Sequence, residues 1–295
     1  MAGGGLKAIK RRLVSIKNTR QITRAMKLVS AAKLNRAQEA VARSREYSKA
    51  LSDVMSTLLN EIGTTEVSHP LMKARETVKN IRLVVVGGSR GLCGAYNTNV
   101  NKAVEAFLRE HKNANVTIDG VLVGRKPSEY FRRMKYSYSK SYEKLPDDPN
   151  AWPISEISQS LETDYIDQKV DEVHLIFTEF RSIMSQRIKT ERLLPFRIDD
   201  TEAPKENSAG GLTIFEPNSD QVFARIIPRL MRMKIQQACL EAKASEHASR
   251  MTAMDAATKN AGELREKLQL LHNRLRQSRI TSELLDIVGG AEALN

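Results

Sequence analysis

The first 62 residues carry apolar side chains every three or four positions, and no helix-breaking residue interrupts them after the start. Between Leu6 and Ile62 the chain has neither glycine nor proline. With Leu6 as heptad position a, eleven of the seventeen a and d positions up to Ile62 are apolar. A sustained apolar seam of period seven predicts a long helix that packs against another helix as a coiled coil.

One part of this seam is polar. Between Arg20 and Ser30 the a and d positions hold polar or charged residues. The larger apolar residues of this stretch are offset from the seam; they are Ile22, Met26 and Val29. Such an offset predicts a local stutter, at which the apolar face of the helix turns toward another partner.

The end of the chain shows the same helical pattern. From Arg229 to Val288 the only breaker is Gly262, and apolar residues again recur at spacings of three and four. Helices of this length gain little stability from intrinsic propensity and need a partner along most of their length. The two arms therefore predict an antiparallel coiled coil, formed by residues 1–69 and 218–295.

Between the arms, short apolar runs alternate with helical stretches. Strands are expected at residues 81–86, 116–123, 136–142, 172–180, 188–198 and 212–216. Helices are expected at residues 97–112, 127–134 and 153–169, and a loop at residues 199–211. This alternation predicts a domain over residues 70–217 with a small, mostly parallel sheet. The predicted fold class is α/β with long terminal helices.

The net charge of +12 is concentrated in the first predicted helix. Residues 1–38 contain ten lysines and arginines, and no acid precedes Glu39. Such a block indicates an acidic partner, which could be nucleic acid, a membrane surface or an acidic protein loop. Aromatic residues are absent from this block, so it lacks the stacking platform typical of single-strand binding. A basic coiled-coil protein that binds nucleic acid or acts as a scaffold is the alternative function.

The sequence offers few groups for catalysis. Its two cysteines, Cys93 and Cys239, lie far apart, and its five histidines lack metal-ligand spacing. The one glycine-rich site, GGSRGLCGAYN at Gly87–Asn97, lies between a predicted strand and a predicted helix, where phosphates often bind. It matches neither GxGxxG nor GxxxxGKS/T, so a tight turn is favoured over a nucleotide-binding enzyme. We therefore expect no catalytic residue, no metal site and no cofactor.

Three segments resemble the γ subunit of F-type ATP synthases. The first, RRLVSIKNTRQITRAMKLVSAAK at Arg11–Lys33, matches the family's pattern of NT, a short basic spacer and IT-x-AM. The second is SRGLCGAYN at Ser89–Asn97, and the third is RQSRITSELLDIVGGAEAL at Arg276–Leu294. In addition, FEPNSDQVFARIIPRL at Phe215–Leu230 looks like the family's entry into its last helix. The resemblance thus covers both ends and the middle of the chain.

This resemblance implies a rotor. The central domain would be Rossmann-like without binding nucleotide, and the coiled coil would stand inside a ring of three α and three β subunits. Its rotation, driven by protons or sodium ions passing the c-ring, would change the conformation of the β catalytic sites. The central domain would contact the ε subunit and the c-ring. The chain would be a non-catalytic subunit and would not bind nucleic acid.

The resemblance also places the contacts with the ring on individual residues. Positions near an acidic lever of β are matched by Met26 and Lys27. Positions that bond to β loops are matched by Arg276, Gln277, Thr281 and Glu283. The apolar bearing of the ring would hold Leu284, Leu285, Ile287 and Val288.

The expected location follows from the same resemblance. No run of 18 apolar residues is present, so no segment is expected to span a membrane. The chain would be peripheral to the membrane through its complex, on the cytoplasmic face of a bacterial inner membrane. We expect no transit peptide, which favours a bacterial chain over a processed mitochondrial one on the matrix side.

Overall fold

A computed structural model describes residues 3–62, 69–112, 116–196 and 219–292. These residues form two compact units. The first unit comprises Met1–Ala31 and Arg250–Asn295, and the second comprises Ala32–Ser249. Two long helices, α1 (Gly3–Ile62) and α5 (Ser219–Glu292), contribute a segment to each unit. In the part of the chain that is described, no helix is both long and apolar enough to cross a membrane.

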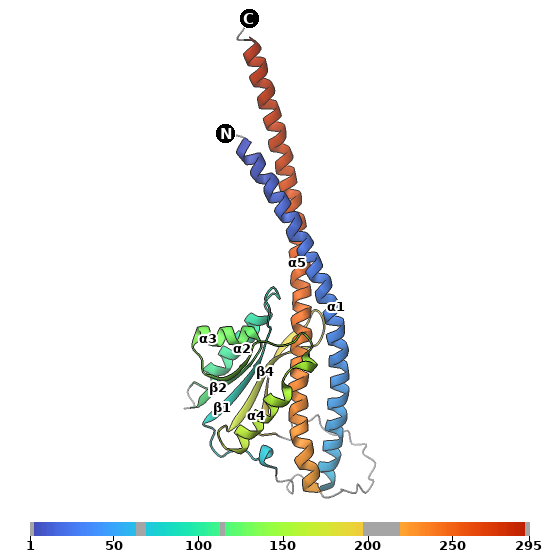
Figure 1. Ribbon diagram of the computed structural model, residues 1–295, viewed down its shortest axis with the longest axis vertical. Coiled ribbons are helices and arrows are strands. Elements are labelled where there is room, and N and C mark those ends of the chain that lie inside the picture. Colours follow the sequence, from blue (N-terminus) through green and yellow to red (C-terminus); the bar gives the residue numbers. More distant parts are fainter. Residues whose placement is uncertain (1–2, 63–68, 113–115, 197–218, 293–295) are drawn as a thin grey trace. The chain divides into compact units, whose positions relative to one another are not determined.

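In the first unit, α1 and α5 run antiparallel. Thr23 Oγ1 lies 2.7 Å from Thr258 Oγ1, and the next pair along the helices joins Lys27 to Asp255. As residue numbers increase along α1, the residue numbers of the partners on α5 decrease, so the two helices run in opposite directions. The predicted antiparallel packing of the two arms is confirmed (Figure 1).

The predicted stutter in the seam between Arg20 and Ser30 is wrong, although Ile22 and Val29 do face away from α5 as expected. The seam positions Thr23 and Ser30 are buried, at 9% and 3% exposure, so the seam faces α5 without a change of phase. The offset residues Ile22 and Val29 are exposed instead. The seam continues because its polar side chains find polar partners on α5, which a count of apolar positions cannot show.

The second unit is built on a five-stranded sheet with strand order β3-β2-β1-β4-β5. Its strands are β1 (Asn80–Val86), β2 (Thr117–Val123), β3 (Tyr138–Tyr142), β4 (Glu172–Phe180) and β5 (Gln186–Leu194). The first four are parallel to their neighbours, and β5 pairs antiparallel with β4. The predicted α/β class is confirmed. The predicted loop at residues 199–211 and strand at residues 212–216 lie outside the described residues.

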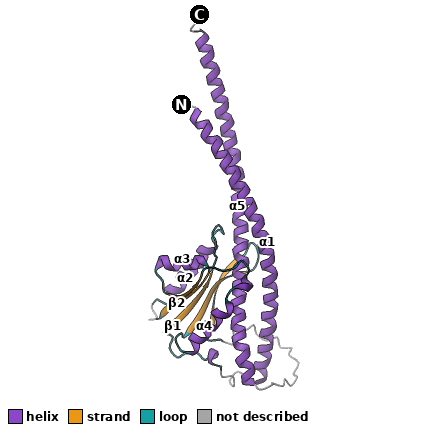
Figure 2. Cartoon of the chain, viewed as in Figure 1, coloured by secondary structure: helices purple, strands orange, loops and turns teal. Residues whose placement is uncertain are grey.

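The connections determine which helices cover which face. The chain passes from β1 to β2 and from β2 to β3 through α2 (Tyr96–Glu110) and α3 (Arg125–Met134). It then returns across the sheet to β4 through α4 (Ile154–Ile166). Because parallel crossovers are right-handed, reversing the direction of travel places α4 on the opposite face. Figure 1 shows α2 and α3 on one side of the sheet and α4 with α5 on the other, and Figure 2 shows the strands between these helices.

Both faces of the sheet are therefore apolar. In β1, Leu83 and Val85 pack against α2 and α3, whereas Val84 and Val86 pack against α4 and α5. A parallel sheet that is covered on both faces needs continuous apolar strands rather than alternating ones. This explains why a run such as IRLVVV is a reliable signal for a central strand.

The α5 helix is enclosed where it crosses the sheet. Residues 238–248 are all buried, although a helix at a surface normally exposes one face. Ser245 Oγ donates to the carbonyl oxygen of Thr178 in β4 at 3.2 Å, and Tyr96 Oη donates to that of Ala242 at 3.0 Å. Arg45 of α1 contacts Glu241 at 3.0 Å. The sheet, the start of α2 and α1 thus surround one segment of α5.

A histidine at the other end of the sheet is half-buried. Nε2 of His174, in β4, lies 2.7 Å from a carboxylate oxygen of Glu172. Its ring lies near the rings of Phe107 and His111. In the β4–β5 pair, His174 is opposite Arg192. Burial lowers the pKa of His174 below its ordinary value, against the opposing effect of Glu172. The neutral form is therefore favoured in the folded state.

We expect the free energy of unfolding to fall as the pH is lowered through about 6.5, the ordinary pKa of histidine. The unfolded chain takes up a proton there that folded His174 resists, so this contribution is complete above that pH and lost below it. Urea unfolding between pH 5 and 8, followed by the single tryptophan Trp152, measures it. A His174→Gln variant should show a shallower pH dependence; an identical slope in both proteins would contradict this assignment.

Candidate functional site

The predicted contact residues on α1 lie in the first unit and are only partly exposed. Lys27 Nζ donates to Asp255 Oδ1 at 2.6 Å, and Lys259 pairs with the other oxygen of Asp255 at 3.3 Å. The hydrogen bond from Lys27 is the main reason that the pKa of Asp255 lies below its ordinary value. Met26 is half-buried beside this pair. Lys27 thus has a partner within its own chain, which the resemblance did not indicate, but its side chain is still 40% exposed.

A second apolar surface lies on α1, away from the seam. It consists of four residues that are 55–62% exposed; this apolar stripe is Val14, Ile22, Leu28 and Val29. Two of its members, Val14 and Leu28, were missed from the sequence. Their signal is apolar character at heptad position b, which faces solvent in an isolated pair of helices. Exposed large apolar side chains on one side of a helix indicate a surface that a partner covers.

The basic block is divided by the structure. Its exposed members at the start of α1, here called the basic collar, are Lys7, Lys10, Arg11, Arg12 and Lys17. Lys33 belongs to the second unit and pairs with Asp147 at 2.7 Å. The collar is therefore a separate cationic surface at the N-terminal end of the chain.

The predicted contact residues near the end of α5 are all exposed. They include Arg276, Gln277 and Thr281. Glu283 accepts a hydrogen bond from Arg279 Nε at 2.7 Å, a pairing within one helical turn. The apolar tail is 57–68% exposed and consists of Leu284, Leu285, Ile287 and Val288. The structure thus collects the predicted contact residues of α5 on one exposed helical segment.

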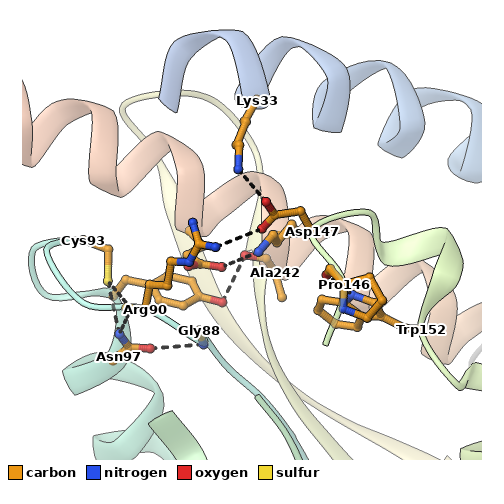
Figure 3. A network of polar contacts seen from close by, with 12 residues as sticks. Lys33, Gly88, Arg90, Cys93, Asn97, Pro146, Asp147, Trp152 and Ala242 are labelled. Carbon is orange, nitrogen blue, oxygen red and sulfur yellow. Dashed lines mark hydrogen bonds and ion pairs between the residues drawn. The ribbon is translucent and has the colours of Figure 1, made fainter. Parts of the chain in front are cut away.

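The glycine-rich loop is a turn that packs closely on α5. Asn97 Oδ1 accepts the backbone N–H of Gly88 at 3.1 Å, and Asn97 Nδ2 donates to the carbonyl oxygen of Arg90 at 3.3 Å (Figure 3). A Cβ atom placed on Gly88 would lie 3.4 Å from the carboxyl carbon of Glu246, a buried residue of α5. A phosphate needs free N–H groups and positive surroundings. Here a side chain already uses the N–H and a carboxylate lies alongside, which fits the predicted turn.

A polar cavity of about 480 Å³ lies between α1, α5 and the β4–β5 hairpin. Its three glutamates each pair with a base: Glu179 with Arg181, Glu191 with Lys189 and Lys234, and Glu241 with Arg45. The two lysines also hold the pKa of Glu191 below its ordinary value despite its burial. With its pKa lowered in this way, Glu191 is unsuited to act as a general acid near neutral pH.

Nearly the whole chain matches known proteins. A family model described as ATP synthase matches residues 5–294. The ATP synthase gamma chain of Bdellovibrio bacteriovorus is 41% identical over 293 residues, and that of Geobacter metallireducens is 42% identical over 289 residues. Each alignment covers 98% of both chains. These matches support the resemblance seen in the sequence and give no support to the nucleic-acid alternative.

Solved structures show the same fold. A chain of the Euglena gracilis mitochondrial ATP synthase, in a structure of OSCP, F1 and c-ring, superposes with a TM-score of 0.63 at 20% identity, covering 99% of this chain and 95% of that one. A chain from the central stalk and c-ring of the Tetrahymena thermophila enzyme gives a TM-score of 0.58 at 23% identity. That alignment covers 80% of this chain and 99% of the other.

Proposed function

The chain belongs to the ATP synthase gamma chain family, and from this premise we propose that it is the central-stalk rotor of an F1Fo ATP synthase. It couples rotation of a c-ring, driven by protons or sodium ions, to conformational change in the β subunits of an α3β3 ring. It is a non-catalytic subunit. Residues 1–69 and 218–295 form the shaft, and residues 70–217 form the domain that contacts ε and the c-ring. The complex holds it at the cytoplasmic face of a bacterial inner membrane.

One observation carries this proposal: the first unit exposes large apolar side chains on both of its helices. The apolar stripe on α1 and the apolar tail of α5 are each more than half exposed. Such surfaces are unfavourable in water and indicate a socket. An α3β3 ring that encloses the shaft would provide one.

The charges of the same unit suit a contact that must be made and released in turn. Exposed ion pairs contribute only about 0.2–1 kcal/mol each. A cationic collar can therefore engage acidic loops of successive β subunits without being trapped by any one of them. Lys27 is held by Asp255, so it would exchange one carboxylate partner for another rather than lose its only one.

Reconstitution tests the proposal. The chain is mixed with α and β subunits, the complex is purified, and its ATPase activity is compared with that of α and β alone. We expect one chain per three αβ pairs and faster steady-state hydrolysis. Failure to form a complex even at low salt would reject the rotor assignment.

Charge reversal in the collar is expected to slow assembly. Replacing Lys10, Arg11 and Lys17 by glutamate should lower the association rate with the α3β3 ring about tenfold or more at low ionic strength, because complementary charge steers encounter. The difference should shrink as salt is added. Stopped-flow mixing measures the rate.

A matched control for this experiment makes the same change in charge elsewhere. Lys102, Lys112 and Lys135 are exposed residues of the second unit, and glutamate at all three should leave the association rate near that of wild type. Equal slowing by the two triple variants would show that net charge alone matters, and that the collar has no special role.

A further inference from the structure

Two polar contacts join α1 directly to the sheet of the second unit. In the first, Lys33 Nζ donates to Asp147 Oδ2 at 2.7 Å. In the second, Arg45 Nη2 donates to the carbonyl oxygen of Phe180, the last residue of β4, at 2.6 Å. Phe180 is at the carboxyl end of its strand, and Asp147 lies in the segment after β3. The first helix is thus attached to the end of β4 and to the segment after β3 without α5 as an intermediary.

The acceptor of the first contact is held firmly in place. The indole N–H of Trp152, a buried residue, donates to the carbonyl oxygen of Pro146 at 2.9 Å. On the other side, Asp148 accepts the backbone N–H of Asn150 at 3.0 Å. Figure 3 shows Asp147 between Lys33 and Arg90, whose guanidinium lies 3.8 Å from the second carboxylate oxygen. The hydrogen bond from Lys33 is the main reason that the pKa of Asp147 lies below its ordinary value.

The second contact is a fork that joins three elements. Besides its bond to β4, Arg45 donates through Nε to Glu241 of α5 at 3.0 Å. Glu241 is only 4% exposed and also accepts from Gln237 at 3.1 Å. A planar guanidinium can serve both acceptors at once, whereas the single ammonium of a lysine cannot reproduce this geometry.

The two contacts are placed so that they oppose more than one motion of α1. Lys33 and Arg45 are twelve residues apart. In an α-helix this separation is about 18 Å along the axis and about 120° around it. Anchors that differ in both height and direction resist sliding of the helix and also its rotation about its own axis.

We propose that the Lys33–Asp147 pair and the Arg45 fork, together called the braces, transmit torque directly between α1 and the α/β domain. Lys33 and Arg45 are then positioning residues for rotary coupling. This inference rests on the proposed rotor function. The apolar contacts between α1 and α5 hold the helices together, but side chains in such a seam can slip past one another under load. Directional hydrogen bonds to the sheet limit that slip.

The test compares coupling with unloaded activity. The complete F1Fo complex is reconstituted in vesicles, and the ions pumped per ATP hydrolysed are measured as the ion gradient builds up. A Lys33→Met plus Arg45→Met variant should pump about twofold fewer ions per ATP at high gradient. The expected loss is modest because partly exposed ion pairs are weak. Its ATPase activity in the soluble α3β3 complex, where no load acts, should be that of wild type.

Three further proteins separate positioning from structural damage. Lys33→Arg keeps a donor to Asp147 and should couple as wild type does. Arg132→Met removes an ion pair to Glu143, at 3.1 Å, that does not involve α1, and should also couple normally. Because Arg45→Met leaves the buried Glu241 with Gln237 as its remaining partner, it can lower the stability of the fold. If the Trp152 unfolding curve of the double variant shifts, the pumping ratio of Lys33→Met alone tests the proposal, because the Lys33 and Asp147 side chains are 31% and 55% exposed.

The outcomes are distinct. Normal pumping under load by a well-folded double variant would overturn the braces and leave the rotor function intact. Equal losses in the Arg132→Met control would also overturn them, since any lost ion pair would then suffice. A wild-type chain that neither assembles nor supports pumping would overturn the rotor function itself.

Discussion

Replacing the apolar tail by serine is expected to weaken binding to the α3β3 ring about tenfold or more. The changes are Leu284→Ser, Leu285→Ser, Ile287→Ser and Val288→Ser. Burial of one such side chain contributes about 1.5–3 kcal/mol, and 1.4 kcal/mol corresponds to a factor of ten in affinity. All four are more than half exposed in the free chain, so their replacement removes little packing within it. Titration of the ring with the chain, followed by ATPase activity, measures the effect.

The control for this prediction removes exposed apolar surface from another place. Ile183 and Met184, in the turn between β4 and β5, are 40% and 85% exposed. Serine at both should leave the affinity for the ring unchanged. The unfolding curve of Trp152 should be that of wild type in both variants, because neither touches the core of the second unit. Wild-type affinity of the tail variant would show that the ring does not hold these side chains.

Replacing Gly124 by alanine is expected to lower the free energy of unfolding of the second unit by about 3 kcal/mol or more. Gly124 connects β2 to α3 with φ +113°, a conformation that side chains disfavour at a cost of about 1–3 kcal/mol. A Cβ atom there would also lie 2.4 Å from the carbonyl oxygen of Gly87. That oxygen belongs to the backbone, so it cannot swing away as a side chain would. Urea unfolding followed by Trp152 fluorescence measures the loss.

Gly91 provides the matched control. It lies in the neighbouring glycine-rich loop, and a Cβ atom placed on it would meet nothing within 4 Å. Gly91→Ala should therefore change the free energy of unfolding by no more than about 0.5 kcal/mol, as is usual at the surface. If the two variants proved equally stable, the close approach of the two turns would not be a constraint on this fold.

Together these predictions separate a buried part of the chain from an exposed one. Gly124 is buried in the second unit, where its neighbours are backbone atoms. The apolar tail and the apolar stripe have no comparable packing of their own. A substitution at Gly124 should lower the free energy of unfolding of the isolated chain. A substitution in the apolar tail or the apolar stripe should be detected only as weaker binding to the ring.

The elements could be predicted from the sequence because their signals are local. The apolar run of β1 and the seam from Leu6 onward depend on residues within a few positions of one another. Spacing alone was also enough to favour a tight turn over a phosphate-binding motif at Gly87–Asn97. Spacing could not show that the loop packs against α5 through Glu246 and Tyr96. Glu246 lies far from Gly88 along the chain, and Tyr96 contacts the distant Ala242.

The error at the seam has the same origin. Heptad counting treats Lys27 and Thr23 as defects, because it scores each helix alone. Their partners Asp255 and Thr258 lie 228 and 235 residues away in sequence, so only the folded chain reveals that the polar positions match. The same holds for Lys33, whose charge in the sequence belongs to the basic block and whose carboxylate partner is 114 residues distant.

By itself, the sequence of this protein determined its helices, its strands, the order in which they occur and the family to which it belongs, since periodicity and motifs are properties of neighbouring residues. Only the tertiary structure decided which charges are neutralised, which glycine meets a backbone oxygen and which apolar residues are left uncovered. These depend on distances between segments far apart in the chain, and such distances are established when α1 and α5 pack against partners that no local pattern encodes.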